Sequence, residues 1–242
     1  MIPHTIHYCW FGGKPLPKSA LKCIASWRKY FPGWEIKQWD ESNFDINAIP
    51  YTKEAAERSK WAFVSDYARF WIIYHHGGVY FDTDVVVIRS MDDIIENGAF
   101  MGFEKSHAGI GVNSGLGIGA PDGLSIYKSI LDYYSSLHFV DSSGKMLPGT
   151  VVKHVTHILK NHGLILEDIN QQVLEINILQ NEYMNPLDDA TGLLNITTNT
   201  RSIHHYAKTW CDNYGPTRTW IMRHLHRIFG IDAFAKLRKL IS

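Results

Sequence analysis

The chain has 242 residues, 45% of them hydrophobic and 20% charged, which is enough for a globular protein with one large α/β domain or two small ones. Its 24 basic and 24 acidic residues balance. This excludes a generally basic protein that binds nucleic acid, and any basic patch must be local.

Cysteine usage and targeting signals indicate the compartment. The three cysteines form no CxxC pair and leave an odd thiol, which favours a reducing compartment over a disulfide framework. No charged segment followed by an apolar stretch opens the sequence. No apolar run approaches the roughly 18 residues that span a bilayer. We therefore expect a cytoplasmic protein.

The first part of the chain predicts a βαβ unit. Residues 2–13 alternate between apolar and polar side chains and predict a strand that delivers Trp10 to a loop. Residues 17–30 have the period of a surface helix, and residues 34–39 alternate again as a strand. A right-handed unit of this kind requires parallel strands, and ligands collect after their carboxyl ends. A lone Trp usually packs in the core, so a nucleotide-binding role for Trp10 depends on a site nearby.

A strongly apolar helix is predicted over residues 59–76, ending at Gly77 and Gly78. Within it, Asp66 and Arg69 are three residues apart and share a face. A simple intrahelical ion pair would contribute only about 0.3–0.5 kcal/mol. Charges on such an apolar helix require a partner or a ligand.

Residues 77–88 carry the acids on which the interpretation depends. In extended backbone, Tyr80, Asp82 and Asp84 would point to one face. Two carboxylates on one face suit a hard divalent cation, Mn²⁺ or Mg²⁺, that also binds a diphosphate. Asp-x-Asp alone is a weak signal, because two acids at a strand end are more often a solvated turn.

Three stretches in this order resemble the DXD sugar-transferase region of glycosyltransferase family 32: IHYCWFGG, WAFVSDYAR and GGVYFDTDV. That group includes bacterial capsular polysaccharide transferases and shares its core with the large clostridial glucosylating toxins. The resemblance implies the α/β GT-A-type fold, a mixed and mostly parallel sheet flanked by helices. We expect this domain over residues 1–215 and a basic amphipathic tail over residues 216–242.

The resemblance also implies roles. Trp10 would stack on uracil, and Asp66 with Arg69 would hold hydroxyl groups of the donor sugar. Asp84 would bind the metal ion, and Asp82 would contact the ribose and reach the metal through water. Tyr80 would line the same pocket. The family retains anomeric configuration, but no residue stands out as a covalent nucleophile.

Residues 109–120 are rich in glycine but lack a P-loop lysine, so we expect the glycines to let backbone approach a ligand. The resemblance places Asn113 near the donor sugar. Strands are expected over residues 99–104, 164–166 and 173–179, and helices over 121–137 and 150–162. The histidines of this part are interpreted as surface or hydrogen-bonded residues.

Residues 202–210 are the second candidate for chemistry. An imidazole is a reasonable third ligand for Mn²⁺, and Lys208 could lie against a diphosphate. The segment resembles the closing loop of the family, which ends at a tryptophan, here Trp210. Adjacent histidines cannot both enter the site from extended backbone, so we select His205, with His204 as the alternative.

Residues 218–239 combine six basic residues with one acid and interleaved apolar side chains. This pattern fits a segment on an anionic membrane surface and fits equally a terminal helix docked on the domain with a solvated basic face.

The leading hypothesis is a metal-dependent retaining transferase that moves a hexose from a nucleotide sugar, UDP-linked, to a saccharide or lipid-linked acceptor in bacterial surface polysaccharide synthesis. It would be cytoplasmic or peripheral on the inner face of the membrane. Two alternatives remain: a phosphatase of the haloacid-dehalogenase type, which FDTDVV superficially resembles, and a non-catalytic carbohydrate-binding module.

Overall fold

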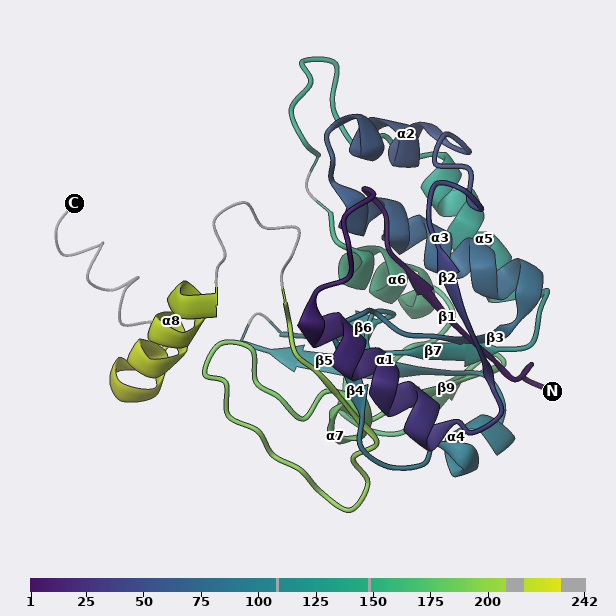
Figure 1. The fold of residues 1–242 in the computed structure, drawn as a ribbon. Helices are drawn as coiled ribbons and strands as arrows, with labels where there is room; N and C mark the ends of the chain where they lie inside the picture. The colour runs from purple at the N-terminus through teal and green to yellow at the C-terminus, as the bar shows by residue number, and fades with distance from the viewer. Residues whose placement is uncertain (108, 148, 208–215, 232–242) are drawn as a thin grey trace, which may run out of the picture.

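The computed structural model describes residues 1–107, 109–147, 149–207 and 216–231. Within them, eight strands form the central sheet of Figure 1, in the order β2-β1-β3-β7-β5-β9-β8 with β6 on β5. Their bounds are β1 Thr5–Cys9, β2 Glu35–Trp39, β3 Gly78–Tyr80, β5 Phe100–Ser106, β6 Gly109–Asn113, β7 Ile118–Ala120, β8 Gln171–Val173 and β9 Ile176–Leu179. The mixed α/β fold expected from the sequence is confirmed.

Helices cover both faces of this sheet. One face packs against α2 (Pro50–Glu57), α3 (Trp61–His76), α5 (Ser125–Ser135) and α6 (Val151–Lys160). The other packs against α1 (Lys18–Tyr30), α4 (Asp92–Glu96) and α7 (Asn181–Met184). Alternate residues of β1 serve the two cores: Cys9 packs on the α3 side, and Ile6 and Tyr8 pack on the α1 side.

The predicted βαβ unit is confirmed, because β1 and β2 run parallel with Ile6 opposite Ile36. Parallel β3 joins the other edge of β1, with Ile6 opposite Val79. The buried ring of His7 ties this region together: its Nδ1 accepts a hydrogen bond from Trp39 Nε1 at 3.0 Å, and Nε2 lies 3.0 Å from the carbonyl oxygen of Gly77. The ends of α3 and β3 are therefore anchored to the first two strands.

The sheet is less parallel than expected. Among the described strands it has three parallel pairings and four antiparallel ones. A short connection causes part of this, because the chain reverses directly between β5 and β6 and cannot return parallel without a long crossover. Strand β7 continues in the direction of β6 and therefore also pairs antiparallel with β5. Residues 173–179, predicted as one strand, contain the reversal between β8 and β9, where Leu174 has φ 52°. Residues 164–166 are not a strand, and α2, α4 and α7 were not predicted.

The acid-bearing stretch is not one continuous strand. Strand β3 ends at Tyr80, and a turn closed by Val85 N donating to Asp82 O at 3.0 Å leads to β4 (Val85–Val87). Strand β4 leaves the main sheet and pairs antiparallel with β10 (Ser202–His204). The extended backbone predicted across residues 80–85 is therefore wrong, because a turn follows Asp82, but Phe81 and Val85 still pack on the α1 side and Tyr80 on the other.

Two glycines of the glycine-rich segment, Gly117 and Gly119, have an explanation other than a ligand. They make room for the protein's own side chains: an added Cβ at Gly119 would lie 2.3 Å from the ring of Phe100, and one at Gly117 would lie 2.7 Å from Phe81. Close packing between the strands and the aromatic core therefore explains both glycines.

Helix α8 (Pro216–Phe229) begins the predicted tail, and residues 232–242 lie outside the described part of the chain. It contacts the loop after Asp188: Arg223 Nε donates to Asp189 O at 3.0 Å, and Arg227 Nε donates to Thr191 O at 2.6 Å. None of the described helices has the length and apolar character needed to cross a membrane.

Candidate active site

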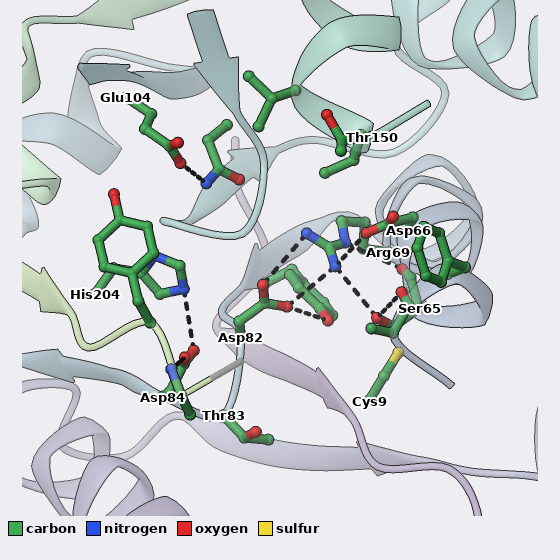
Figure 2. A pocket seen from close by; sticks show the side chains of 18 of the residues that line it. Cys9, Ser65, Asp66, Arg69, Asp82, Thr83, Asp84, Glu104, Thr150 and His204 are labelled. Atoms are coloured by element: carbon green, nitrogen blue, oxygen red, sulfur yellow. Dashed lines mark hydrogen bonds and ion pairs between the residues drawn. The ribbon is translucent and has the colours of Figure 1, made fainter. Parts of the chain in front are cut away.

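A cavity of about 1000 Å³ opens beyond the carboxyl ends of β1 and β3. One wall comes from the loop after β1, the first half of α3 and the turn of residues 82–84. The other comes from β5, β6 and α6, and residues 204–207 close it. Figure 2 shows ten of these residues by name. This is the edge of the sheet where the sequence predicted a ligand.

A cluster of three potential metal ligands lies in the cavity. Asp82, Asp84 and His204 each offer a ligand atom, and these atoms lie within 4.8 Å of one another. His204 Nε2 lies 3.2 Å from Oδ1 of Asp84, the contact drawn in Figure 2. The antiparallel pairing of β10 with β4, with His204 opposite Val85, brings the imidazole there. Two carboxylates and one imidazole form a donor set that fits Mn²⁺ or Mg²⁺.

The structure places the alternative, His204, and not the first choice, His205, beside the two acids. The two side chains alternate at the end of β10, so His204 is buried beside Asp84 while His205 is exposed. His205 instead contributes its backbone N–H, which donates to Asp84 O at 3.0 Å. Lys208 and Trp210 lie outside the described residues.

The charges of the cluster are coupled. Burial alone would raise the pKa of Asp84, but the adjacent His204 and the N–H of Ala207 hold it at about 2. Burial would lower the pKa of His204, and the attraction of Asp84 outweighs it and raises the pKa to about 9. Burial raises the pKa of Asp82, opposed by Arg69. Nδ1 of His204 is buried without a hydrogen-bond partner in the described structure. A divalent cation on His204 would require the neutral ring, so binding would release a proton.

Arg69 connects Asp66 to the acid cluster. Its Nη2 lies 2.9 Å from Asp66 Oδ1 and 3.2 Å from Asp82 Oδ1, and both pairs are drawn in Figure 2. Tyr80 donates its hydroxyl to the same Asp82 oxygen at 2.9 Å. The Arg69 guanidinium is almost fully buried and also donates to Ser65 O at 3.0 Å. The intrahelical pair exists, but it is half of a larger network that fixes the orientation of Asp82.

This network changes the acidity of Asp66. Burial raises the pKa of its carboxyl to about 7, although Arg69 opposes the shift. Desolvation disfavours the charged Arg69 as well, but Asp82 and its neighbours raise the pKa of the guanidinium and keep it ionised. A fixed cation between two acids is an arrangement that can bind sugar hydroxyl groups, which both donate and accept hydrogen bonds.

Trp10 and Asn113 also line the cavity. Trp10 is half-buried, and its indole N–H donates to the carbonyl of Lys14, which orients the ring. Asn113 is buried, with its Oδ1 accepting from Gly115 N at 2.7 Å and its Nδ2 donating to Glu104. The structure therefore brings all the described candidate residues to one cavity, with His205 the exception.

The lining residues that the sequence analysis missed include Trp61, Glu104 and Tyr206. Trp61 is the first residue of α3, and its position on the apolar stripe of the helix indicated a core residue instead of a cavity-lining one. Glu104 is the acid that follows the apolar first half of β5, a signal that could have marked it. Tyr206 donates its hydroxyl to Asn185 Oδ1 at 2.6 Å, a contact between distant segments that no local pattern reveals.

Comparison with known proteins agrees with this site. Residues 17–101 match the model of the family described as glycosyltransferase sugar-binding region containing DXD motif. The resemblance seen in the sequence is thereby confirmed, and the matched residues include Asp82 and Asp84.

Two curated relatives match parts of the chain. A glycosyltransferase of Acanthamoeba polyphaga mimivirus is 32% identical over 106 residues, covering 41% of this chain and 42% of the relative. Inositol phosphoceramide mannosyltransferase 1 of Schizosaccharomyces pombe is 27% identical over 116 residues, covering 41% and 33%. The chain thus spans less than half the length of either relative. Among solved structures, a glycosyltransferase involved in the glycosylation of the major capsid of PBCV-1 is similar with a TM-score of 0.48 and 11% identity, covering 85% of this chain and 95% of that one.

Proposed function

We propose that this protein is a metal-dependent retaining glycosyltransferase that uses a nucleotide diphosphate sugar, UDP-linked, as donor. One observation carries the proposal: Asp82 belongs to two groups within a single cavity. It forms a donor set for a hard cation with Asp84 and His204, and it also pairs with Arg69, the partner of Asp66. A cation-bound diphosphate and its sugar would therefore have adjacent places. The DXD family match over the same residues supports this assignment.

Each residue has a defined part in this proposal. Asp82, Asp84 and His204 would hold Mn²⁺ or Mg²⁺, which when bound offsets the negative charge that develops on the departing diphosphate. Trp10 would contact the base, and Tyr80 would hold Asp82 through its hydroxyl. Asp66, Arg69 and Asn113 would bind the sugar, and Lys208 and Trp210 would close over the nucleotide.

The acceptor in this proposal is a saccharide or a lipid-linked saccharide, and the biological setting is surface polysaccharide synthesis. The named mannosyltransferase relative supports a hexose as the transferred group. The cavity continues past Asn113 along α6, which leaves room for an acceptor beside the donor.

A donor panel tests the proposal. The protein is incubated with Mn²⁺ and UDP-, GDP- and ADP-linked hexoses, and release of free nucleoside diphosphate is measured. We expect release from one donor class, abolished by EDTA and restored by Mn²⁺. Rapid hydrolysis of p-nitrophenyl phosphate with no nucleotide release would instead indicate the phosphatase. Carbohydrate binding without nucleotide affinity would indicate the binding module.

We further propose that the protein acts in the cytoplasm, on the inner face of the membrane, with α8 as its contact. Several large apolar side chains of α8 and of the loop after Asp188, which α8 contacts, are exposed: Leu193, Leu194, Ile196, Trp220, Ile221, Ile228 and Phe229. Arg223 and Arg227 are engaged by the loop after Asp188, so the remaining basic residues of the tail would supply the attraction to anionic lipid.

Sedimentation with vesicles tests this contact. We expect binding to vesicles that contain phosphatidylglycerol, weaker binding to purely zwitterionic vesicles, and loss of binding in Trp220→Ser/Phe229→Ser. Equal sedimentation of the variant and the unchanged protein would contradict the contact. Leu21→Ser, which removes an exposed apolar side chain from α1, is the control.

A further inference from the structure

The α6 wall of the cavity carries a row of basic side chains that the donor site does not use. Lys153, His157 and Lys160 all line the cavity. They are spaced i, i+4 and i+7 on α6, so they lie along one face of the helix over about 10 Å. The opposite face of α6, with Val155 and Leu159, packs into the core.

Close contacts with β6 fix the position of this wall. Thr156 Oγ1 accepts a hydrogen bond from Val112 N at 2.8 Å. A Cβ added to Gly111 would lie 2.8 Å from Val152 and 2.9 Å from Thr156, so the helix and the strand are as close as a glycine allows. Because β6 continues to Asn113, the basic row belongs to the same rigid frame as the proposed sugar-binding residues.

The charges on this wall are not balanced by acids. Apart from Asp66, Asp82 and Asp84, two acids line the cavity, and both already have partners: Glu104 accepts from Asn113, and Asp189 pairs with Arg223 at 3.3 Å. No ion pair or side-chain hydrogen bond is formed by the ammonium groups of Lys153 and Lys160 within the described parts of the chain. Two ammonium groups beside an open cavity favour an anion, and phosphate oxygens suit them best.

Apolar side chains lie beside the basic row. Ile110 and Leu166 line the same region, together with the first two residues of α6. A purely saccharide pocket would present many hydrogen-bonding groups here. A phosphate ester, by contrast, offers an anionic group for the lysines and an organic group for the apolar surface.

We propose that the α6 wall is the acceptor subsite and that it binds an acceptor carrying a phosphate ester, through Lys153 and Lys160. The proposal rests on the transferase function above, because it places the acceptor beside the donor in one cavity. The phosphate can belong to a sugar phosphate or to a lipid phosphate, and the chemistry of recognition is the same.

Calorimetric titration tests this subsite. The full chain is first saturated with Mn²⁺ and UDP, so that a phosphate probe cannot occupy the donor part. Glucose 1-phosphate, hexyl phosphate and neutral glucose are then titrated into the unchanged protein and into Lys153→Gln/Lys160→Gln. The matched control is Lys22→Gln/Lys29→Gln, which removes two exposed lysines of α1 outside the cavity. Circular dichroism verifies that both variants fold.

We expect at least one phosphate probe to bind, and the α6 variant to weaken it by roughly tenfold or more while the α1 variant does not. Tighter binding of hexyl phosphate would indicate a lipid acceptor, and tighter binding of glucose 1-phosphate would indicate a saccharide acceptor. The proposal is overturned if neither phosphate binds, if neutral glucose binds equally, or if the α6 variant leaves affinity unchanged.

The titrations also distinguish a failure of the transferase assignment from a failure of the acceptor subsite. If UDP with Mn²⁺ does not bind, the transferase assignment fails. The same probes titrated without nucleotide, with EDTA to remove metal, then still report whether the lysines bind phosphate. UDP binding that persists in Lys153→Gln/Lys160→Gln alongside lost probe affinity would separate the acceptor subsite from the donor site.

Discussion

Gly115 lies against Asp82: a Cβ added to this glycine would fall 2.2 Å from Oδ2 of the carboxylate and 3.2 Å from Nη1 of Arg69. The backbone between β6 and β7 thus forms the surface on which the acid rests. The Gly115 carbonyl also accepts from Asp82 N at 3.3 Å. The position of the DXD acid therefore depends on a residue in a different part of the chain.

The first prediction concerns this contact. Gly115→Ala should move the Asp82 carboxylate, because the added methyl group occupies its place, and should lower donor turnover by roughly a hundredfold. Steady-state release of nucleoside diphosphate measures this. Gly102→Ala is the matched control, since the one close contact of its Cβ is the flexible end of Met184, at 2.5 Å, and it should retain turnover. If Gly115→Ala and Gly102→Ala lose turnover equally, the loss comes from disturbed packing and not from a displaced Asp82 carboxylate.

Asp84→Asn should abolish metal-dependent turnover and leave the fold intact. The amide removes a negative ligand oxygen, and the loss of several kcal/mol of charge stabilisation corresponds to roughly a thousandfold in rate. Donor cleavage at saturating Mn²⁺ is the measurement, with circular dichroism to verify folding. Asp132→Asn, which removes an exposed acid of α5, should behave as the unchanged protein. Retained activity in Asp84→Asn would refute the role.

The two adjacent histidines give an internal comparison. His204→Ala should weaken Mn²⁺ binding by roughly tenfold or more, because it removes one of three ligands. His205→Ala should have little effect, because that side chain is exposed. Mn²⁺ titration monitored by electron paramagnetic resonance reports both affinities. The opposite ranking would restore His205 as the ligand.

Arg69→Met should destabilise the fold. The change leaves Asp66 and Asp82 without their shared cation in a buried position, for which about 3–5 kcal/mol is typical. Urea unfolding at pH 7 measures the loss. The double variant Arg69→Met/Asp82→Asn should recover part of it, because it removes the carboxylate that loses its pairing cation. Asp66 is not the choice for this test, because its pKa is about 7 beside Arg69 and rises further without it, so that this carboxyl is protonated at pH 7. If the double variant is no more stable than the single one, the destabilisation does not come from the unpaired carboxylate of Asp82.

We expect the buried ring of His7 to make the free energy of unfolding depend on pH. Burial lowers the pKa of its ring from 6.5 to about 4, outweighing the hydrogen bond to Gly77 that acts to raise it. The unfolded chain therefore binds a proton between pH 6.5 and 4 that the folded chain does not, and stability falls as pH falls through this range. We expect about 2 kcal/mol of such loss between pH 7 and pH 5.

Urea unfolding at the two pH values measures this effect. His7→Gln retains a side-chain amide near the Gly77 carbonyl but cannot be protonated in this range, so its loss of stability on acidification should be smaller by that amount. Identical pH dependence in both proteins would show that His7 is not the responsible group.

The order of motifs along the chain determined the general class of this protein and most of its site. Local periodicity located α1, α3, α5 and α6, because each carries an apolar face with the helical period. The two acids of the DXD motif, and the pair of Asp66 and Arg69 in α3, were recognisable from the sequence because their spacing is short and their chemistry is distinctive.

Tertiary structure alone decided the rest. Residues 80–85 look like one strand, but the chain turns between Asp82 and Val85 because β4 pairs with β10 instead of the main sheet. That pairing over more than a hundred residues also selects His204 over His205. Neither choice is encoded within a short window: side-chain direction in a strand alternates with every residue, so only the register against a distant partner decides which histidine enters the site.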